Sequence, residues 1–187
     1  TPPKEACSGK DEWTPFHTNT TERRKSPMSI AAVRDYFAQF GMADNVLEFS
    51  TSSATVELAA QAAGVIPARI AKSLSFKVDG KAILIITAGD AKVDNAKFKN
   101  AFHTKAKMLT PEEVVDLVGH AVGGVCPFAI KEDVAVYLDC SMKRFPSVFP
   151  AAGSANSAIE LTCDQLEQYA QNVQGWGDFC KGWQAED

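Results

Sequence analysis

The stretch that decides the fold is IAKSLSFKVDGKAILIIT, which runs from Ile70 to Thr87. Residues 70–78 and 82–87 are rich in apolar and β-branched side chains, and the second run is continuous enough to fit a buried strand. Between them lies Asp79-Gly80-Lys81, whose glycine is typical of a hairpin turn. The sequence therefore predicts two paired strands joined by a short turn.

Helical signals precede this hairpin. Apolar residues at helical spacing over 30–40 predict a helix that Ser29 caps and Gly41 ends. An alanine-rich segment led by Ser53 predicts a second helix, which closes at Gly64.

Two capping boxes follow the hairpin. Thr110-Pro111-Glu112-Glu113 predicts a helix to Val118, and Thr162-Cys163-Asp164-Gln165 predicts a last helix to about Asn172. Short strands are expected at 46–49, 128–130 and 134–138. Strands and helices are mixed without an internal repeat, which favours an α/β or α+β fold.

Length and composition favour one domain. The chain has 187 residues, 45% of them hydrophobic and 22% charged, which are ordinary values for a globular protein with a real core. Residues 1–27 have no sustained apolar period, so we interpret them as a flexible N-terminal extension or a remnant of cloning. Residues 28–187 are then the folded domain.

The charge is unevenly distributed. The net charge of −4 argues against a polyanion as partner, but it is an average over the whole chain. From Arg69 to Lys107 nine basic residues stand against three acidic ones, whereas from Met108 onward four stand against twelve. The basic block is either a solvated lysine face or a surface for phosphates.

Several protein classes lack support. No apolar run is long enough to span a membrane, and no secretory signal is recognisable. The five cysteines are odd in number and contain no CxxC motif, which fits neither a disulfide framework nor a zinc site and favours a reducing cytoplasm. The three histidines lack metal-ligand spacing, and the common hydrolase and nucleotide-binding motifs are missing.

The most unusual segment is the glycine-rich run from Gly119 to Phe128. Backbone N–H groups of such a loop can converge on an anion or a developing oxyanion, although a tight helix-to-strand connection is the favoured interpretation of the glycines alone. Cys126 is a candidate nucleophile with His120 as its base, but an inert buried thiol is the favoured interpretation.

Two charged residues adjoin apolar strands. Lys72 stands among Ile70, Leu74 and Phe76, so its ammonium either reaches out from the edge of the core or points into a cleft. Asp139 ends the apolar run that begins at Val134, where an aspartate serves as a cap or borders an active cleft.

Five segments in register resemble the YbaK/ProX family of aminoacyl-tRNA deacylases, which is related to the editing domain of bacterial prolyl-tRNA synthetases. They are Ala54–Ala60, Arg69–Phe76, Ala88–Asp94, Gly123–Phe128 and Val136–Asp139. The resemblance covers about 28–176. It implies a compact α/β domain with a mixed, barrel-like sheet surrounded by helices, and it implies no metal and no cofactor.

The family resemblance also implies an activity, the hydrolysis of the ester that joins a wrong amino acid to tRNA. The substrate's own ribose hydroxyl would largely activate the attacking water. The implied partners are the acceptor end of an aminoacyl-tRNA and, in addition, an aminoacyl-tRNA synthetase.

The resemblance assigns roles to individual residues as well. Lys72 would hold the phosphate and terminal adenosine, and Asp139 would orient the loop or the substrate. Backbone from Gly123 and Gly124 to Pro127 would stabilise the oxyanion. The substrate-binding residues would be Lys72, Thr55, Val125, Cys126 and Phe128, with Cys126 lining the pocket as a small side chain.

Two questions stay open at this level. Residues 150–160 contain no histidine, unlike the Asn-His-Pro-type segment of the prolyl-synthetase-like subgroup, so the edited amino acid is not assigned. A non-catalytic module of the same fold that binds tRNA, a nucleotide or a small molecule is the alternative, because a fold alone does not determine function.

Overall fold

The computed structural model describes residues 30–183, and the predicted extension over 1–27 lies outside the described residues. Its centre is the predicted hairpin, in which β2 (Ile70–Val78) pairs antiparallel with β3 (Lys81–Ala88). Asp79 and Gly80 form the turn with φ values of 50° and 76°, the left-handed conformations that a two-residue turn requires. The hairpin prediction is confirmed, with a turn one residue shorter than expected.

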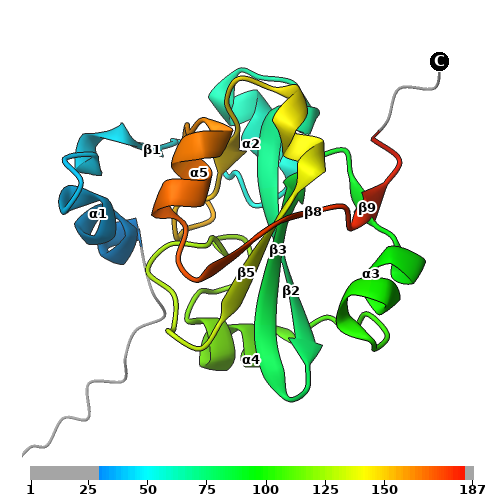
Figure 1. Cartoon of the computed structure of the whole chain (residues 1–187). Helices are drawn as coiled ribbons and strands as arrows, with labels where there is room; N and C mark the ends of the chain where they lie inside the picture. The colour runs from blue at the N-terminus through cyan, green and yellow to red at the C-terminus, as the bar shows by residue number, and fades with distance from the viewer. Residues whose placement is uncertain (1–29, 184–187) are drawn as a thin grey trace, which may run out of the picture.

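The hairpin lies within a mixed five-stranded sheet of order β6-β2-β3-β5-β8. The strands β5 (Ala135–Asp139), β6 (Phe149–Pro150) and β8 (Val173–Gly177) all join it by parallel pairing. The sheet curls into an open half-barrel, which confirms the predicted fold class (Figure 1). Two short ladders complete the strands: β1 (Val46–Glu48) with β7 (Ser157–Ile159), and β4 (Lys92–Val93) with β9 (Cys180–Lys181).

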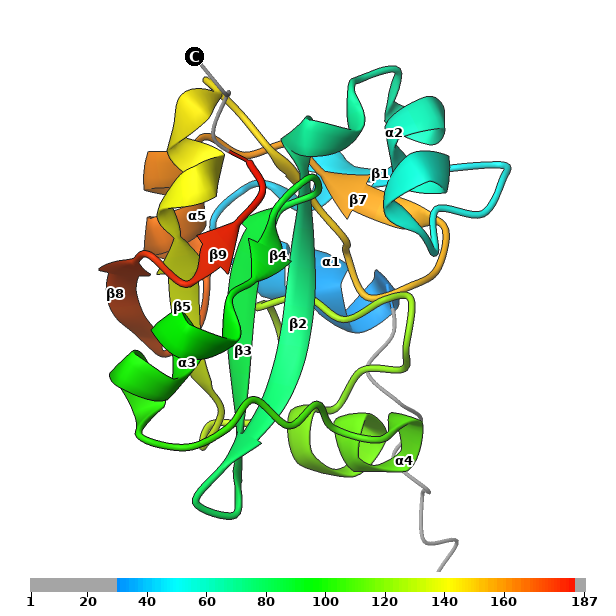
Figure 2. The same cartoon turned by 90° about the vertical axis from the view of Figure 1, so that its right-hand side faces the viewer.

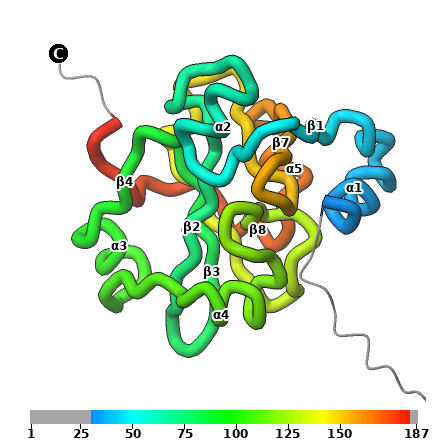
Figure 3. Tube along the Cα trace, turned by 180° about the vertical axis from the view of Figure 1, so that it is seen from behind, coloured from blue at the N-terminus to red at the C-terminus, as the bar shows by residue number. Residues whose placement is uncertain are grey.

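In the part of the chain that the structure describes, five α-helices surround the sheet, with α1 and α3 on opposite sides of the central strands (Figures 1 and 3). They are α1 (Ile30–Ala38), α2 (Val56–Ala63), α3 (Asn95–Phe102), α4 (Pro111–Glu113) and α5 (Cys163–Tyr169). A π-helix (Val114–Val118) continues α4, and 3₁₀ turns cover Ala43–Asn45, Pro67–Arg69 and Cys140–Arg144. Within the described part, every helix is too short or too polar to cross a bilayer.

Local signals predicted the starts of α4 and α5 correctly, whereas α3 was not predicted and the predicted cap Ser29 of α1 lies outside the described residues. Both capping boxes are present, at Thr110 and at Thr162. The N-cap of α2 is Thr55 rather than Ser53, because the Thr55 hydroxyl accepts the N–H of Leu58 at 3.2 Å. The last helix ends at Tyr169, before the predicted Asn172.

The strand predicted at 128–130 is wrong. Ala129 has a φ of 52°, which a strand cannot accommodate. Phe128 is fully buried against Phe37, with ring centroids 4.7 Å apart. The apolar character of this segment therefore reflects packing of an irregular loop into the core, not pairing in a sheet.

One edge of β2 is only partly covered. Next to β3 the ladder runs from Ala71 to Val78, but on the opposite edge β6 pairs only with Ile70 and Ala71. The segment that joins α3 to α4 pairs farther along, where Leu109 N–H donates to Ser75 O and Met108 bridges Phe76 (Figure 2). Among the described residues, no strand pairs with this edge between Ala71 and Ser75, so β2 has an open gap there.

Candidate active site

A cavity of about 340 Å³ lies at this gap in the edge of β2. Its walls come from the start of α2, from β2, from the segment that enters α4, from the glycine-rich loop and from the β6–β7 region. The side chains are mostly small or apolar, as in ligand sites that use few polar groups for orientation. The lining includes Ser53, Thr55, Lys72, Ser73, Gly123 and Val125.

Two serines of the cavity wall were missed by the sequence predictions. The hydroxyl oxygens of Ser53 and Ser73 are buried and have no hydrogen-bond partner within the described part of the chain. Alternation along β2, with Lys72, Leu74 and Phe76 on one face, was the signal that could have placed Ser73 and Ser75 together on the other. These hydroxyls are available to a group bound in the cavity.

Replacing Ser73 by alanine should therefore leave the free energy of unfolding unchanged or raise it by up to about 1 kcal/mol, because no hydrogen bond is lost. The matched control is Ser141→Ala, whose fully buried hydroxyl accepts the N–H of Ala88 at 3.1 Å and whose loss should cost about 1–3 kcal/mol. Urea denaturation of both variants measures the difference. Equal destabilisation by the two substitutions would show that Ser73 has an internal partner.

Lys72 stands at the rim of the cavity. Its side chain is half-buried, and Nζ donates to the carbonyl oxygen of Gly89 at 3.5 Å. Burial lowers the pKa of the Lys72 ammonium below its ordinary value, while the carboxylates of Asp90 and Glu57 act in the opposite direction. Glu57 lies in the first turn of α2, so the ammonium and the positive end of this helix share one region.

The glycine-rich loop forms another wall of the cavity. Gly123 has a φ of 94°, and a Cβ there would lie 3.4 Å from the Cβ atoms of Ala54 and Ala155. Gly124 packs so closely on the chain at Gly153 that a Cβ would lie 2.7 Å from its carbonyl carbon. The N–H of Gly124 donates to Ala121 O at 3.0 Å. The loop therefore offers the cavity the backbone of Gly123 and the residue Val125, but not the N–H of Gly124.

The following three residues of the loop are buried in the core. Cys126, Pro127 and Phe128 are buried, and they lie outside the lining of the cavity. This placement differs from the expectation that the side chains of Cys126 and Phe128 face the substrate. The physical reason is that the Phe128 ring packs against Phe37 in the core. Because Cys126 and Pro127 directly precede Phe128, they are buried with it.

Cys126 and His120 do meet, although spacing in the sequence could not establish it. The thiol sulfur lies 3.5 Å from His120 Nε2, and this nitrogen lies 2.7 Å from the carbonyl oxygen of Phe128. Both residues are fully buried, and burial raises the pKa of the Cys126 thiol to about 12 from its ordinary value of 9.0. A thiol with this pKa is protonated at neutral pH and is not an activated nucleophile.

Iodoacetamide at pH 8 should therefore leave Cys126 unmodified in the folded protein, whereas the half-buried Cys140 and Cys163 should react before it. Reactivity of Cys126 should rise only as the pH approaches 12 or the protein unfolds. Mass spectrometry of proteolytic peptides measures the modification of each cysteine. Rapid labelling of Cys126 at pH 8 would restore the thiol as a candidate nucleophile.

Asp139 is fully buried and lies outside the lining of the cavity. Its carboxylate accepts the N–H of Ser141 at 3.0 Å and the N–H of Phe179 at 2.8 Å. These contacts make it the N-cap of the 3₁₀ turn that follows β5. The Asp139 carboxylate is therefore held inside the fold by two hydrogen bonds, and it does not face the cavity.

The same region brings three potential metal ligands together. Ligand atoms of Asp139, Cys140 and Asp178 lie within 4.8 Å of one another. Both Asp139 oxygens already accept main-chain N–H groups, and Asp178 forms an ion pair with Lys97 at 2.8 Å. Since these oxygens are already occupied, we assign no metal to this group.

The fold and the cavity define an α/β domain that can hold a small group beside a lysine, main-chain atoms and serine hydroxyls. Residues 51–169 match the model of the aminoacyl-tRNA editing domain, and the chain belongs to this family. The match spans α2, β2, the glycine-rich loop and β5, which are the elements that form and support the cavity.

Individual relatives agree with this assignment. The chain is 53% identical to the uncharacterized protein YwhH of Bacillus subtilis over 84% of its own length and 100% of that protein. It is 30% identical to the proline–tRNA ligase of Lysinibacillus sphaericus over 66% of its length, but it spans only 24% of that ligase. A crystal structure of a candidate trans-editing enzyme for prolyl tRNA synthetase superimposes with a TM-score of 0.74 at 30% identity, covering 84% of this chain and 99% of that one.

Proposed function

We propose that this protein is a trans-editing hydrolase that removes a wrongly attached amino acid from tRNA. The observation that carries the proposal is the cavity at the open edge of β2, with the Lys72 ammonium at its rim and the Gly123 backbone in its wall. The aminoacyl group would enter the cavity, and the terminal nucleotide would remain at the mouth. A volume of about 340 Å³ is at the small end of ligand sites, which suits an amino acid rather than a larger group.

The mouth of the cavity suits a nucleotide. Met108 and Val122 belong to the lining and are 57% and 64% exposed, so they offer apolar contact to the terminal base and ribose. Lys72 supplies a positive charge for the adjoining phosphate. The exposed Lys105 and Lys107 lie in the segment that leads to Met108, and they extend the positive charge toward the acceptor stem.

The proposed reaction is ester hydrolysis by water. Water attacks the carbonyl carbon, the bond from this carbon to the ribose oxygen breaks, and the proton released by water goes to that oxygen. The neighbouring ribose hydroxyl of the substrate orients the water and relays the proton. The protein contributes position and hydrogen-bond donors for the oxyanion, which are worth about 10²- to 10³-fold per donor in other hydrolases. Thr55 caps α2 at the wall and fixes the backbone beside this point.

Turnover of a panel of mischarged tRNAs tests the proposal. A proline-accepting tRNA is charged separately with alanine, serine, cysteine, threonine and proline, and release of each amino acid is followed with enzyme in excess. We expect at least one ester to be cleaved well above its spontaneous rate, with a steep loss of affinity as salt increases. Tight tRNA binding without cleavage of any ester would instead favour a non-catalytic binding module. A synthetase is the further partner we propose, and it can be added to the same assay.

A further inference from the structure

The carbonyl oxygen that holds Lys72 is fixed from both sides. Gly89 lies in the connection from β3 to β4, between Ala88 and Asp90, and each of these neighbours has a partner on the 3₁₀ turn Cys140–Arg144. Gly89 is itself closely packed on α2 and the turn before β2, since a Cβ there would lie 2.1 Å from Pro67 O and 2.7 Å from a methyl group of Val56. The hydrogen-bond acceptor of Lys72 is therefore a rigid point of the fold.

On one side, the support runs through two buried residues. The N–H of Ala88 donates to the hydroxyl of Ser141 at 3.1 Å, and the N–H of Ser141 donates to Asp139 at 3.0 Å. Asp139 and Ser141 are both fully buried. A chain of hydrogen bonds thus connects Asp139 with the N–H of Ala88, the residue that precedes Gly89.

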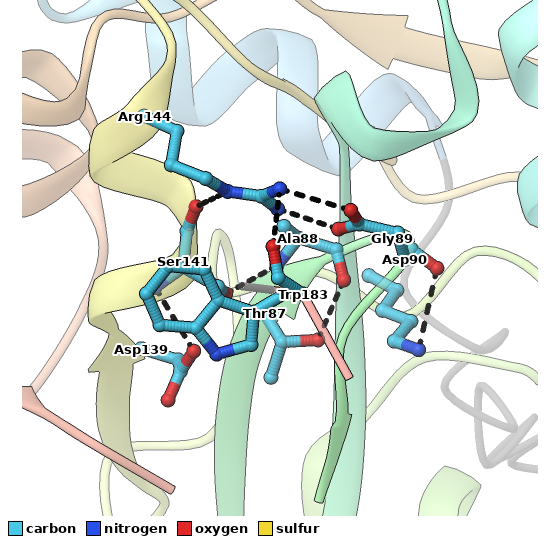
Figure 4. A network of polar contacts seen from close by, with 9 residues as sticks. Thr87, Ala88, Gly89, Asp90, Asp139, Ser141, Arg144 and Trp183 are labelled. Carbon is cyan, nitrogen blue, oxygen red and sulfur yellow. Dashed lines mark hydrogen bonds and ion pairs between the residues drawn. The ribbon is translucent and has the colours of Figure 1, made fainter. Parts of the chain in front are cut away.

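On the other side, Arg144 forms an ion pair with Asp90. Its guanidinium donates two bonds to the Asp90 carboxylate, from Nη2 to Oδ1 at 2.5 Å and from Nη1 to Oδ2 at 2.9 Å (Figure 4). Two further donors are used, because Nε donates to Ser141 O at 2.8 Å and Nη1 also donates to Trp183 O at 3.0 Å. The guanidinium lies over the rings of Phe145 and Trp183, 4.8 and 5.1 Å from their centroids. A bidentate pair of this kind fixes orientation as well as distance.

We propose that the Arg144–Asp90 ion pair and the Asp139–Ser141 pair are positioning elements that hold the Gly89 carbonyl and, through it, the ammonium of Lys72. They touch neither the cavity nor the substrate, and they act on the reaction only through the place of one cation. This inference rests on the proposed function. It also gives Asp139 a defined task, the orientation of the β3–β4 connection rather than of the glycine-rich loop.

Arg144→Ala is the most direct variant, because Arg144 is at the surface and its loss should not unfold the protein. We expect a decrease of about tenfold in kcat/KM for the ester cleaved best in the panel. The decrease should appear in the same kinetic parameter, kcat or KM, that Lys72→Ala changes. In a Lys72→Ala background Arg144→Ala should cause no further loss, because its effect passes through Lys72. Arg144→Lys, which keeps the charge but not the fork, should recover only part of the activity.

The control is Arg34→Ala, which removes another arginine–carboxylate ion pair, more exposed and with Glu48 at 3.1 Å, away from the cavity. It should leave kcat/KM within twofold of the unaltered protein. Equal losses in the Arg34 and Arg144 variants, or a full additional loss in the double variant with Lys72→Ala, would overturn the positioning role.

A readout without activity separates this inference from the proposed function. In protein labelled with ¹³C-lysine, the Hε–Cε resonance of Lys72 is assigned by its disappearance in Lys72→Ala. Arg144→Ala should move this resonance and leave that of Lys77 in place, whereas Arg34→Ala should move neither. A stationary Lys72 resonance in Arg144→Ala overturns the inference whatever the enzyme does. Absence of turnover in the panel with a moving Lys72 resonance overturns the proposed function alone.

Discussion

Lys72→Ala should lower kcat/KM for hydrolysis of the mischarged tRNA by about 10- to 10²-fold, because a hydrogen bond from a charged group, here to the phosphate, is worth about 1.5–3 kcal/mol. Lys72 is the cation of the cavity lining. It is half-buried, and in such a setting a charge interacts more strongly with a phosphate than it would in open solvent. Single-turnover release of the amino acid from tRNA measures the loss.

The control for this prediction is another lysine of the same hairpin. Lys81 is exposed at the start of β3, beside the turn, and lies outside the cavity lining. Lys81→Ala removes the same charge, so it corrects for any general change in attraction to tRNA, and it should reduce kcat/KM less than threefold at moderate salt. If Lys72→Ala cleaves the ester as fast as the unaltered protein does, Lys72 is not part of the site.

The second large effect is expected for Gly124→Ala. The backbone of Gly124 is not in the left-handed region, so the cost is steric: the added Cβ would lie 2.7 Å from Gly153 C and from Ser154 N. Backbone atoms cannot move aside as a flexible side chain can, so the loop must shift away from this segment. We expect a loss of about 1–3 kcal/mol in the free energy of unfolding. Deacylation should fall by up to about 10²-fold, because Gly123 moves with the loop.

Gly80→Ala separates instability from displacement of the site. Gly80 has a φ of 76°, and an added Cβ would meet no atom within 4 Å. An alanine there therefore costs only the energy of the left-handed backbone conformation, about 1 kcal/mol. It lies in the hairpin turn and not in the cavity lining, so the variant should be less stable and fully active. Urea denaturation and single-turnover assays of both variants provide the comparison. Full activity in Gly124→Ala would show that the close contact with Gly153 is dispensable.

Local sequence patterns predicted the central hairpin and the helices that begin with a capping box, which short-range chemistry specifies. The β2–β3 hairpin depends on a turn in which Asp79 and Gly80 adopt left-handed conformations, and the capping boxes at Thr110 and Thr162 depend on hydrogen bonds within four residues. These interactions join near neighbours in the chain, so they depend little on tertiary contacts. The turn of π-helix after α4 and the strands β4, β6, β7, β8 and β9 were not predicted. The helix α3 was missed as well, although its N-cap Asp94 is a local signal that could have indicated it.

The segment from Gly123 to Phe128 shows where local patterns fail. Its glycines indicated a wall of the site, and Gly123 does line the cavity. The same pattern could not tell that Phe128 would pack on Phe37, 91 positions earlier in the chain, and that Cys126 would be sealed beside His120. Whether a loop residue faces a cavity or the core depends on the partners available on each side, and those come from other elements.

By itself, the sequence determined the mixed α/β class, the central hairpin and the residues through which the family resemblance is visible, because propensity, capping and alternation act between near neighbours. Only the tertiary structure decided what surrounds Lys72. The open gap in β2 arises because β6 and the α3–α4 segment each cover a different part of one strand edge. The Gly89 carbonyl is fixed by Ser141 and Arg144, which are 53 and 54 positions from their bonded partners Ala88 and Asp90. Contacts over such separations exist only once the sheet has formed, so no local pattern encodes them.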